Sequence, residues 1–495
     1  MKRRNTLSIL LLTAMLAQLA ACGGAAESTD TTAAGAVDTT AAETTAPVEY
    51  EKPDVDYGGK TFTIASFNFD MNYVVSSYHL ISHDEESGDV INDAIVQMTR
   101  QVEEDLNVKL ELFELLTADR NNVDKITKPI YAGEDVMQAA FPLTVGLTKL
   151  LAVPSLLTDL DEIETLDLSH SWWDQNSVEE YNIGGKQYTA VGDACFFAKA
   201  APIVNFFNKQ LLTDYKLENP YELVYSGNWT MDKMIEMATA AANDLNGNQQ
   251  VDEADCFGLI GEISGTAYFL TGMGIDWSKR GKDDELEITF YSERATEAME
   301  KMIPFMNTQN VVMNDHYWKH DVSVFTEVFV PTFMANRALF FSNQLLLALD
   351  FRAMDADFGT LPMPKLDASQ KEYYSTTNTY WRDNVVVPAT NTDLDMTGHV
   401  LDAMGYYSQQ LVTPAFIDTT VLGKSVRDDD SANMIEIIFD SMSYDVARLF
   451  DWGGINSMLS TMYKNNNTGL ASEYATIEPN IKAAMEKTME ELLDN

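Results

Sequence analysis

Cysteine, basic residues and long apolar runs are all scarce in this chain of 495 residues. Three cysteines cannot build a disulfide framework, and their spacing matches neither a zinc finger nor a redox CxxC motif. The 33 Lys and Arg residues oppose 76 Asp and Glu residues, which gives a formal net charge of −43. Because a polyanion of this strength repels phosphate backbones, nucleic-acid binding through a basic groove is excluded.

Familiar catalytic motifs are also missing. The chain has no Walker A motif, no Gly-x-Ser-x-Gly elbow and no His-Glu-x-x-His. His316 and His320 have i, i+4 spacing, but no third ligand is specified, so a solvated helix face is favoured over a zinc site. We therefore expect a protein that is not an enzyme. The many carboxylates leave a glycoside hydrolase with two paired acids as the alternative.

The N-terminal segment predicts export and lipidation. Lys2, Arg3 and Arg4 precede a short apolar stretch, which is typical of a signal peptide and too short for a stable membrane span. Leu19-Ala20-Ala21-Cys22 then resembles the lipobox of bacterial lipoproteins, in which the cysteine carries the lipid. We expect residues 1–21 to be removed and Cys22 to anchor the protein on the extracellular face of the bacterial cytoplasmic membrane. An ordinary signal peptide that contains a cysteine is the alternative.

Residues 22–56 have the composition of a tether. Ala and Thr make up 15 of the 22 residues from Ala25 to Ala46, and no aromatic residue occurs between Cys22 and Tyr50. Such a segment cannot bury enough apolar surface to offset the entropy lost on ordering. The folded body is expected to span residues 57–495, and its hydrophobic fraction of 45% is that of a globular protein.

The start of the body predicts an α/β fold. Residues 60–66 alternate with the period of a strand, and Asp89 can cap a helix whose apolar positions continue to Leu106. Asn107 ends that helix, and alternation resumes at Val108. A strand–helix–strand unit favours parallel pairing, and a further strand at residues 135–141 extends the expected doubly wound sheet.

An acidic loop at residues 244–255 has the spacing of a cation site. It resembles the calcium loops of EF-hands and dockerins, which wrap about 6–8 oxygen ligands around the ion. Two departures weaken the match, because Gln249 replaces the turn glycine and the last ligand is the short Asp255. A structural Ca²⁺ site is expected, with an acidic surface loop as the alternative. The candidate ligands are Asp244, Asn246, Asn248, Gln250, Asp252 and Asp255.

Six short segments follow one another in a distinctive order along the body. They are Trp172-Trp173, Ile183-Gly184-Gly185-Lys186-Gln187-Tyr188, Phe207-Asn208-Lys209, Asn228-Trp229-Thr230-Met231-Asp232, Phe358-Gly359-Thr360-Leu361-Pro362-Met363-Pro364-Lys365 and Lys424-Ser425-Val426-Arg427-Asp428. This ordered set resembles the family 1 extracellular solute-binding lipoproteins of bacterial ABC transporters, and the likeness spans essentially the whole chain after Tyr57.

The resemblance implies a two-lobed, periplasmic-binding-protein-like (Venus-flytrap) α/β fold in which hinge strands join the lobes. One lobe would comprise about 57–200 plus about 385–425, and the other about 201–384 plus the C-terminal helices. It further implies a monomer that binds a carbohydrate between the lobes and delivers it to an ABC transporter permease. A surface-anchored glycan hydrolase and a non-catalytic glycan-binding adhesin are the alternatives.

The same resemblance places ligand-binding residues on loops that follow the strands of each lobe. Trp381 is the strongest single candidate, and a surface tryptophan that covers a lobe is the alternative interpretation. Trp229 is expected to pack, as is at least one residue of the Trp172-Trp173 pair. Cys195 and Cys256 either form a disulfide or remain small apolar side chains. The candidate ligand-binding residues are Phe67, Asn68, Phe141, Asn343, Gln344, Tyr380, Trp381 and Arg382.

Overall fold

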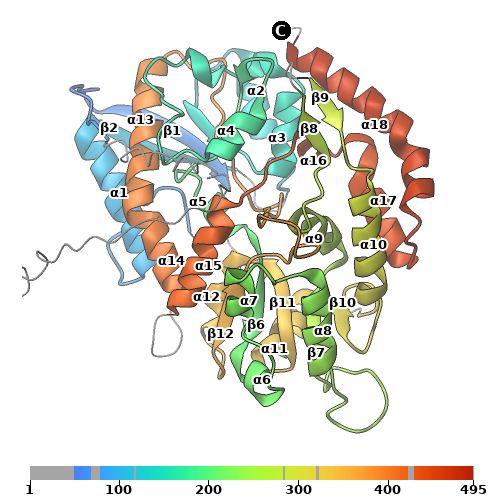
Figure 1. Ribbon diagram of the computed structural model, residues 1–495. Helices are drawn as coiled ribbons and strands as arrows, with labels where there is room; N and C mark the ends of the chain where they lie inside the picture. Colours follow the sequence, from blue (N-terminus) through green and yellow to red (C-terminus); the bar gives the residue numbers. More distant parts are fainter. Residues whose placement is uncertain are drawn as a thin grey trace, which may run out of the picture. The chain divides into compact units, whose positions relative to one another are not determined.

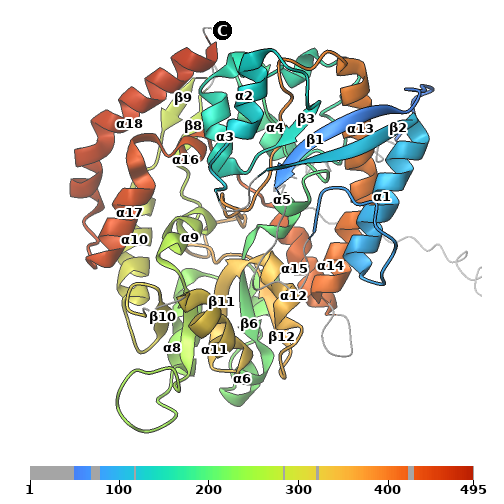
Figure 2. The same cartoon turned by 180° about the vertical axis from the view of Figure 1, so that it is seen from behind.

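Two β-sheets organise the described part of the protein in a computed structural model, which Figures 1 and 2 show from opposite sides. The described residues are 50–67, 78–115, 119–281, 285–318, 323–421 and 428–493. The predicted signal peptide, Cys22, Asn68 and His320 lie outside them. Residues Val48–Asn495 form one compact unit by their contacts.

The strands fall into a small parallel sheet, a larger mixed sheet and two short hairpins. The small sheet has the order β2-β1-β3, and the larger one the order β10-β7-β11-β6-β12. The strands are β1 Lys60–Phe67, β2 Val108–Leu115, β3 Ala139–Phe141, β4 Asn182–Ile183, β5 Lys186–Gln187, β6 Ile203–Asn208, β7 Phe257–Gly261, β8 Ser278–Arg280, β9 Leu286–Ile288, β10 Val312–Asn314, β11 Ala338–Gln344 and β12 Phe358–Leu361.

Helices surround both sheets, and in Figure 1 the long C-terminal helix α18 lies beside α17. The helices are α1 Val90–Leu106, α2 Asp124–Ala132, α3 Thr144–Leu151, α4 Gln175–Tyr181, α5 Phe196–Ala200, α6 Lys209–Asp214, α7 Pro220–Tyr225, α8 Met231–Ala241, α9 Thr266–Gly272, α10 Glu293–Met306, α11 Val330–Met334, α12 Ala348–Phe351, α13 Leu394–Tyr407, α14 Thr413–Val421, α15 Asp429–Asp440, α16 Val446–Phe450, α17 Ile455–Lys464 and α18 Leu470–Leu493.

The first strand–helix–strand unit forms as its sequence predicts. The Asp89 carboxylate accepts hydrogen bonds from the backbone N–H groups of Ile91 and Asn92, which caps α1. Asn107 takes up the left-handed conformation, with φ of 48°, and ends the helix. Strands β1 and β2 then pair in parallel along their full length, with Lys60 opposite Val108. The predicted crossover connection and parallel register are both confirmed.

One expected strand is shorter than predicted, and a second stretch of the chain pairs irregularly. The third strand begins at Ala139 rather than at residue 135. The Gln138 backbone N–H still donates to the Thr63 carbonyl over 2.9 Å, while its side chain accepts from the Thr63 N–H and donates to the Asp135 carboxylate. Residues 385–387 do not form a continuous strand. They make isolated bridges, since Val385 pairs with Ala190 while Val386 pairs with Ala140. Changing partner at each residue prevents a continuous ladder.

The five-stranded sheet is mixed and buried along its centre. β10 and β11 each run parallel to β7, whereas β11 and β12 are both antiparallel to β6. All residues of β6, β7 and β11 are buried, so these strands show no alternation between buried and exposed positions, and β6 and β11 bury polar as well as apolar side chains. Helix α8, capped by the Thr230 hydroxyl, packs against β7 and β11.

Three chain segments pass side by side between the two sheets. Pro202 forms a bridge with Thr377, and Ser375 forms one with Met442. The chain therefore leaves the small-sheet region before β6, returns after β12 and crosses again before α16. The predicted residue limits of the two lobes remain a prediction.

The three tryptophans of the Trp172-Trp173 and Trp229 segments pack in the interior. Trp172, Trp173 and Trp229 are all fully buried, and the indole N–H of Trp229 donates to the Pro362 carbonyl over 2.9 Å. Cys195 and Cys256 are both buried and free, so they do not form a disulfide in this structure. Burial raises the pKa of the Cys256 thiol to about 11, which keeps it protonated.

Candidate functional site

A cavity of about 850 Å³ opens at the place where the crossing segments meet both sheet regions. Helix α3 and Tyr181 line it from the side of the small sheet. Residues 263–268, which follow β7, and helix α17 line it from the side of the five-stranded sheet. The crossing segment 376–382 forms the wall between them.

A second cavity of about 290 Å³ adjoins the first, because Ser264, Tyr268 and Tyr380 line both. We refer to the two cavities together as the cleft. The larger cavity alone has the volume of sites which hold small organic ligands in proteins, about 300–1,000 Å³. Contributions from segments about 340 residues apart, such as Asn121 and Lys464, make it a product of the tertiary fold.

Five of the predicted binding residues line the cleft. Tyr380 lines both cavities and is 56% exposed, whereas Trp381 lines the smaller one and is 8% exposed. The guanidinium carbon of Arg120 lies 3.5 Å from the centre of the Trp381 ring, so one face of that ring is already covered. The others are Asn343 and Gln344, at the end of β11, and Arg382.

The remaining predicted residues lie elsewhere. Phe67 and Phe141 are buried in the core beside the small sheet and are not among the described residues that line the cleft. Asn68 falls outside the described residues. His316, at the other candidate metal position, sits in a turn where its backbone N–H donates to the Asn314 side chain.

Arg382 is held rigidly by neutral acceptors. Its Nε donates to the Thr144 hydroxyl over 2.9 Å, and its Nη2 donates to the Tyr181 hydroxyl over 2.6 Å. The guanidinium carbon also lies 5.0 Å from the centre of the Tyr444 ring. Because Asn384 Nδ2 donates to the same Thr144 hydroxyl over 3.0 Å, residues 382–384 are fixed to the start of α3.

An uncommon carboxyl group lies beside the amides of the cleft. Burial, with the nearby Asp315 carboxylate, raises the pKa of Glu262 to about 7. Its Oε2 accepts a hydrogen bond from Asn343 Nδ2 over 3.2 Å. Close to neutral pH, therefore, Glu262 exists partly as a protonated acid that can donate to a ligand oxygen.

Sequence reasoning missed the contribution of the C-terminal region. Arg448, on α16, and several polar residues of α17 line the larger cavity. The Gly453-Gly454 pair signals the sharp turn that positions α17, since both residues have positive φ. A Cβ on Gly453 would lie 2.4 Å from Ile481 Cγ1, so only glycine allows this close approach of α18.

The acidic loop 244–255 is closed by its own side chains. The Asp244 carboxylate accepts hydrogen bonds from the N–H groups of Gly247 and Gln249, over 2.7 and 2.8 Å. Gln249 has φ of 60°, the left-handed conformation that a glycine adopts at the equivalent position of an EF-hand. Asp255 is 6% exposed, and its Oδ1 has no hydrogen-bond partner.

The described residues contain no group of three or more His, Cys, Asp or Glu side chains arranged to hold a metal ion. Across the same residues, no helix combines the length and the apolar character needed to cross a bilayer.

Comparison with known proteins gives matches among solved structures only. No protein-family model matches the chain, and no curated protein matches it significantly. The ABC substrate-binding protein of Listeria monocytogenes, solved with cycloalternan, superposes with a TM-score of 0.56 at 14% identity. That match covers 86% of this chain and 99% of the other.

Two further structures have similar likeness. The GacH receptor of Streptomyces glaucescens, studied with acarbose, gives a TM-score of 0.53 at 13% identity over 88% of this chain and 99% of its own. UgpB of Mycobacterium tuberculosis, in complex with glycerophosphocholine, gives a TM-score of 0.54 at 14% identity, and the match covers 80% of this chain and 95% of UgpB. The chain therefore has the two-lobed α/β fold of periplasmic-binding-protein-like solute-binding proteins, as the sequence predicts.

Proposed function

We propose that this protein is the extracellular solute-binding component of an ABC importer and that it binds a carbohydrate in the cleft. The exposed ring of Tyr380, placed among amide side chains in a cleft between two sheet regions, is the observation that carries the proposal. Aromatic faces stack on sugar rings, and amide and hydroxyl groups satisfy sugar hydroxyls. The fold and the structural neighbours support the same function.

In this proposal the predicted residues have different roles. Tyr380 stacks on the sugar, while Trp381 offers its edge because Arg120 covers one face of its ring. Asn343 and Gln344 hydrogen-bond the sugar hydroxyls from the end of β11. Phe67 and Phe141 support the sheet beneath the site rather than touching the ligand.

Binding is reversible and involves no chemistry. Residues on both sides of the cleft contact a bound sugar together only when the lobes are closed, so the sugar shifts the population toward the closed form. The closed form then docks on a membrane permease, and a monomer suffices for this cycle. The competing adhesin would bind a glycan without this closure.

The N-terminal region completes the proposed location. Residues 1–21 act as a lipoprotein signal peptide, Cys22 carries the lipid, and residues 22–56 hold the body away from the bilayer. The lipobox resemblance and the Ala/Thr-rich composition support this part of the proposal.

A structural calcium ion in loop 244–255 is a further part of the proposal. The left-handed Gln249 and the unpartnered buried oxygen of Asp255 fit a loop that wraps a hard cation. Asp244, Asn246, Asn248, Asp252 and Asp255 would supply side-chain oxygens, and Gln250 a backbone carbonyl. The ion would brace the loop and take no part in sugar binding.

A surface-anchored glycan hydrolase is the second candidate, because Glu262 and Asp315 form a carboxyl pair in the cleft. Burial, with a smaller contribution from Asp315, raises the pKa of Glu262, and a raised pKa is what the general acid of a glycosidase requires. The Asp315 Oδ1, however, is committed to the Ile263 N–H over 2.7 Å. The structural neighbours described above are binding proteins.

The test is a thermal melt of the full-length protein, with calcium, against monosaccharides, oligosaccharides and short peptides. A ligand at about 100 times its dissociation constant adds about 2.7 kcal/mol to the free energy of unfolding, which raises the melting temperature measurably. An upward shift with a sugar that is recovered intact is expected. Cleavage of the sugar would establish the hydrolase, and a response to peptides alone would overturn the carbohydrate.

A further inference from the structure

Two arginine side chains face the larger cavity without a carboxylate partner. Arg382 is 4% exposed and donates to the hydroxyls of Thr144 and Tyr181. Arg448 Nη1 donates to the Thr271 hydroxyl over 2.6 Å, and its Nη2 donates to the Ser443 carbonyl over 2.5 Å. All four acceptors are neutral. Within the described part of the chain, neither guanidinium forms an ion pair with a carboxylate.

The carboxylates that line the same cavity are occupied by other donors. Both oxygens of Asp445 are engaged, Oδ2 by the N–H groups of Trp277 and Ser278, and Oδ1 by the Ser278 hydroxyl and the Arg448 backbone N–H. Asp315 accepts from the Ile263 N–H, and Asp451 caps the start of α17 by accepting from the Asn456 N–H. The Asp445 charge still acts on Arg448 through space, since it opposes the lowering of the Arg448 pKa that burial causes. In the described part of the chain, however, no hydrogen bond joins a carboxylate to either guanidinium.

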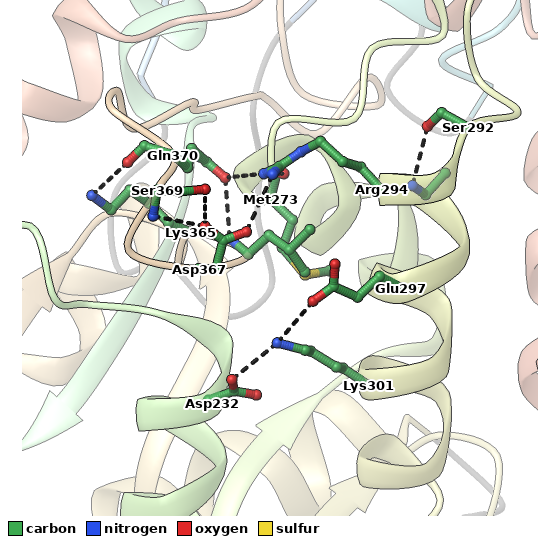
Figure 3. A network of polar contacts seen from close by, with 12 residues as sticks. Asp232, Met273, Ser292, Arg294, Glu297, Lys301, Lys365, Asp367, Ser369 and Gln370 are labelled. Carbon is green, nitrogen blue, oxygen red and sulfur yellow. Dashed lines mark hydrogen bonds and ion pairs between the residues drawn. The ribbon is translucent and has the colours of Figure 1, made fainter.

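An arginine elsewhere in the protein shows how this chain normally compensates such a charge. Arg294, on α10, forms an ion pair with Asp367 over 3.2 Å and donates to Gln370, as Figure 3 shows. In the same network Lys301 is paired with both Asp232 and Glu297. With 76 acidic residues against 33 basic ones, carboxylate partners are abundant, so two cations facing a cavity without one require an explanation.

The cost of burial supplies that explanation. A buried charge is unfavourable unless it is paired, and the guanidinium fork matches the two oxygens of a carboxylate or phosphate. Tyr181 lies close enough to both arginines to feel their charges: burial raises the pKa of Tyr181, and each of the two guanidinium groups lowers it. The two guanidinium groups and the Tyr181 hydroxyl therefore form one donor cluster on the wall of the larger cavity, which Tyr380 also lines.

We infer that the sugar bound in the cleft carries an anionic group, a carboxylate or a phosphate, which Arg382 and Arg448 hold. This inference rests on the proposed function and narrows its substrate class from carbohydrates in general to acidic sugars. The anionic group is accepted locally although the chain as a whole is strongly negative, because the guanidinium donors lie within a low-dielectric wall that screens them little. Tyr380 supplies the ring that stacks on the sugar.

The test offers the full-length protein a mixture of neutral and acidic oligosaccharides from xylan and pectin digests, together with hexose 6-phosphates. Native mass spectrometry then identifies what is retained. Retention of uronate-bearing sugars or of sugar phosphates supports the inference and says which anion is held. Retention of neutral sugars alone overturns it. If no sugar is retained, the proposed function fails and the inference fails with it.

Variants then test the assignment to the two arginines. Arg448→Gln is expected to lower the affinity for the retained acidic sugar about 10- to 100-fold, because one or two charge-assisted hydrogen bonds are lost. The same sugar with its carboxylate reduced to an alcohol is the neutral control, and Arg448→Gln should change the affinity for this control less than about threefold. Arg448→Lys should recover part of the affinity, and Arg294→Gln, matched in chemistry but distant, should have no effect.

The folding of each variant is checked by its melt without ligand. If Arg448→Gln melts as the wild type does yet binds the acidic sugar equally well, the assignment to Arg448 is overturned. Arg382→Gln is the second variant, because Arg382 makes separate contacts to α3 and α4. Equal losses for the acidic sugar and its reduced counterpart would mean that both arginines are merely structural.

Discussion

We expect Tyr380→Ala to weaken binding of the sugar that the melts identify while leaving the fold unchanged. Tyr380 is 56% exposed, and its contacts with the crossing segment come from its backbone, whose N–H donates to the Asn378 side chain over 3.0 Å. Surface substitutions of this kind usually change the free energy of unfolding by less than about 0.5 kcal/mol. The melting temperature without ligand should therefore move by no more than about 2 °C.

The expected loss of affinity follows from the exposed area of the ring. An aromatic side chain presents about 200 Å², so roughly 110 Å² of Tyr380 remains available to a ligand. At about 25 cal/mol per Å², covering all of that area is worth at most about 2.8 kcal/mol, and covering one face about half as much. Tyr380→Ala should thus raise the dissociation constant about 10- to 100-fold.

Isothermal titration calorimetry of the wild type, Tyr380→Ala and Tyr380→Phe distinguishes stacking from hydrogen bonding. Tyr380→Phe retains the ring, so its affinity should stay within about threefold of the wild type. An unchanged affinity for Tyr380→Ala would refute the stacking role, because the ring would then not touch the ligand. Equal losses for both variants would transfer the role from the ring to the hydroxyl.

Trp381 provides the contrast. Because it is 8% exposed and packs against Arg120, truncation to alanine removes buried contacts and should lower the free energy of unfolding by about 3 kcal/mol or more. A weaker affinity in Trp381→Ala could therefore come either from partial unfolding or from a lost contact with the ligand, and the measurement would not separate the two causes. The tryptophan that the sequence ranks first is for this reason the poorer probe of the site.

Three further outcomes are expected. Folding raises the pKa of Glu262 from 4.5 to about 7, so as the pH rises the unfolded chain loses this proton before the folded chain does. The free energy of unfolding of the wild type therefore falls between these two pH values. Glu262→Gln lacks this loss, so urea melts at pH 4, 5.5 and 7.5 should show its free energy of unfolding rising relative to the wild type by up to about 3 kcal/mol. Calcium should raise the melting temperature, and Asp244→Ala should abolish that effect. Gln249→Gly should relieve the strain of the positive φ at this position. A melting temperature that does not change when calcium is chelated would exclude a bound ion. Cys22→Ser should abolish incorporation of labelled palmitate and release the protein from membranes, whereas labelling that persists would exclude lipidation at this residue.

The local elements could be predicted because short-range physics determines them. Asp89, Leu106 and Asn107 define a capped amphipathic helix, and the flanking alternation defines two strands. Thr230 likewise marks the start of α8. Each of these predictions depends on residues within a few positions of one another, so the sequence contains the information that the fold uses.

The cleft could be predicted only in part, because its walls come from segments that meet through tertiary packing. Asn343, at the end of β11, was accessible to the rule that binding residues follow strands, whereas Tyr380 is a candidate because it precedes the stretch 385–387. Phe141 obeys the same rule yet is buried in the core, since consecutive side chains of a strand point to opposite faces and the rule does not say which face carries the site. Arg448 and Tyr181 follow no strand, and their proximity to Arg382 becomes evident only when three crossings bring residues 181, 382 and 448 together.

The two ends of segment 376–384 are attached to different parts of the protein, and this arrangement couples ligand contact to closure. The Asn378 N–H donates to the Ala201 carbonyl and its side chain to Gln344 of β11, whereas the Thr379 and Arg382 carbonyls accept from the first N–H groups of α3. The Asn378 side chain and carbonyl accept from the N–H groups of residues 380–382, so residues 378–382 would move together with α3 while Tyr268 and Asn343 move with the five-stranded sheet. A sugar held by Tyr380 and Tyr268 together then gains its second contact only on closure, which is the differential interaction that a population shift requires. Tyr268→Ala should accordingly reduce affinity and also leave the protein open in solution scattering when ligand is bound.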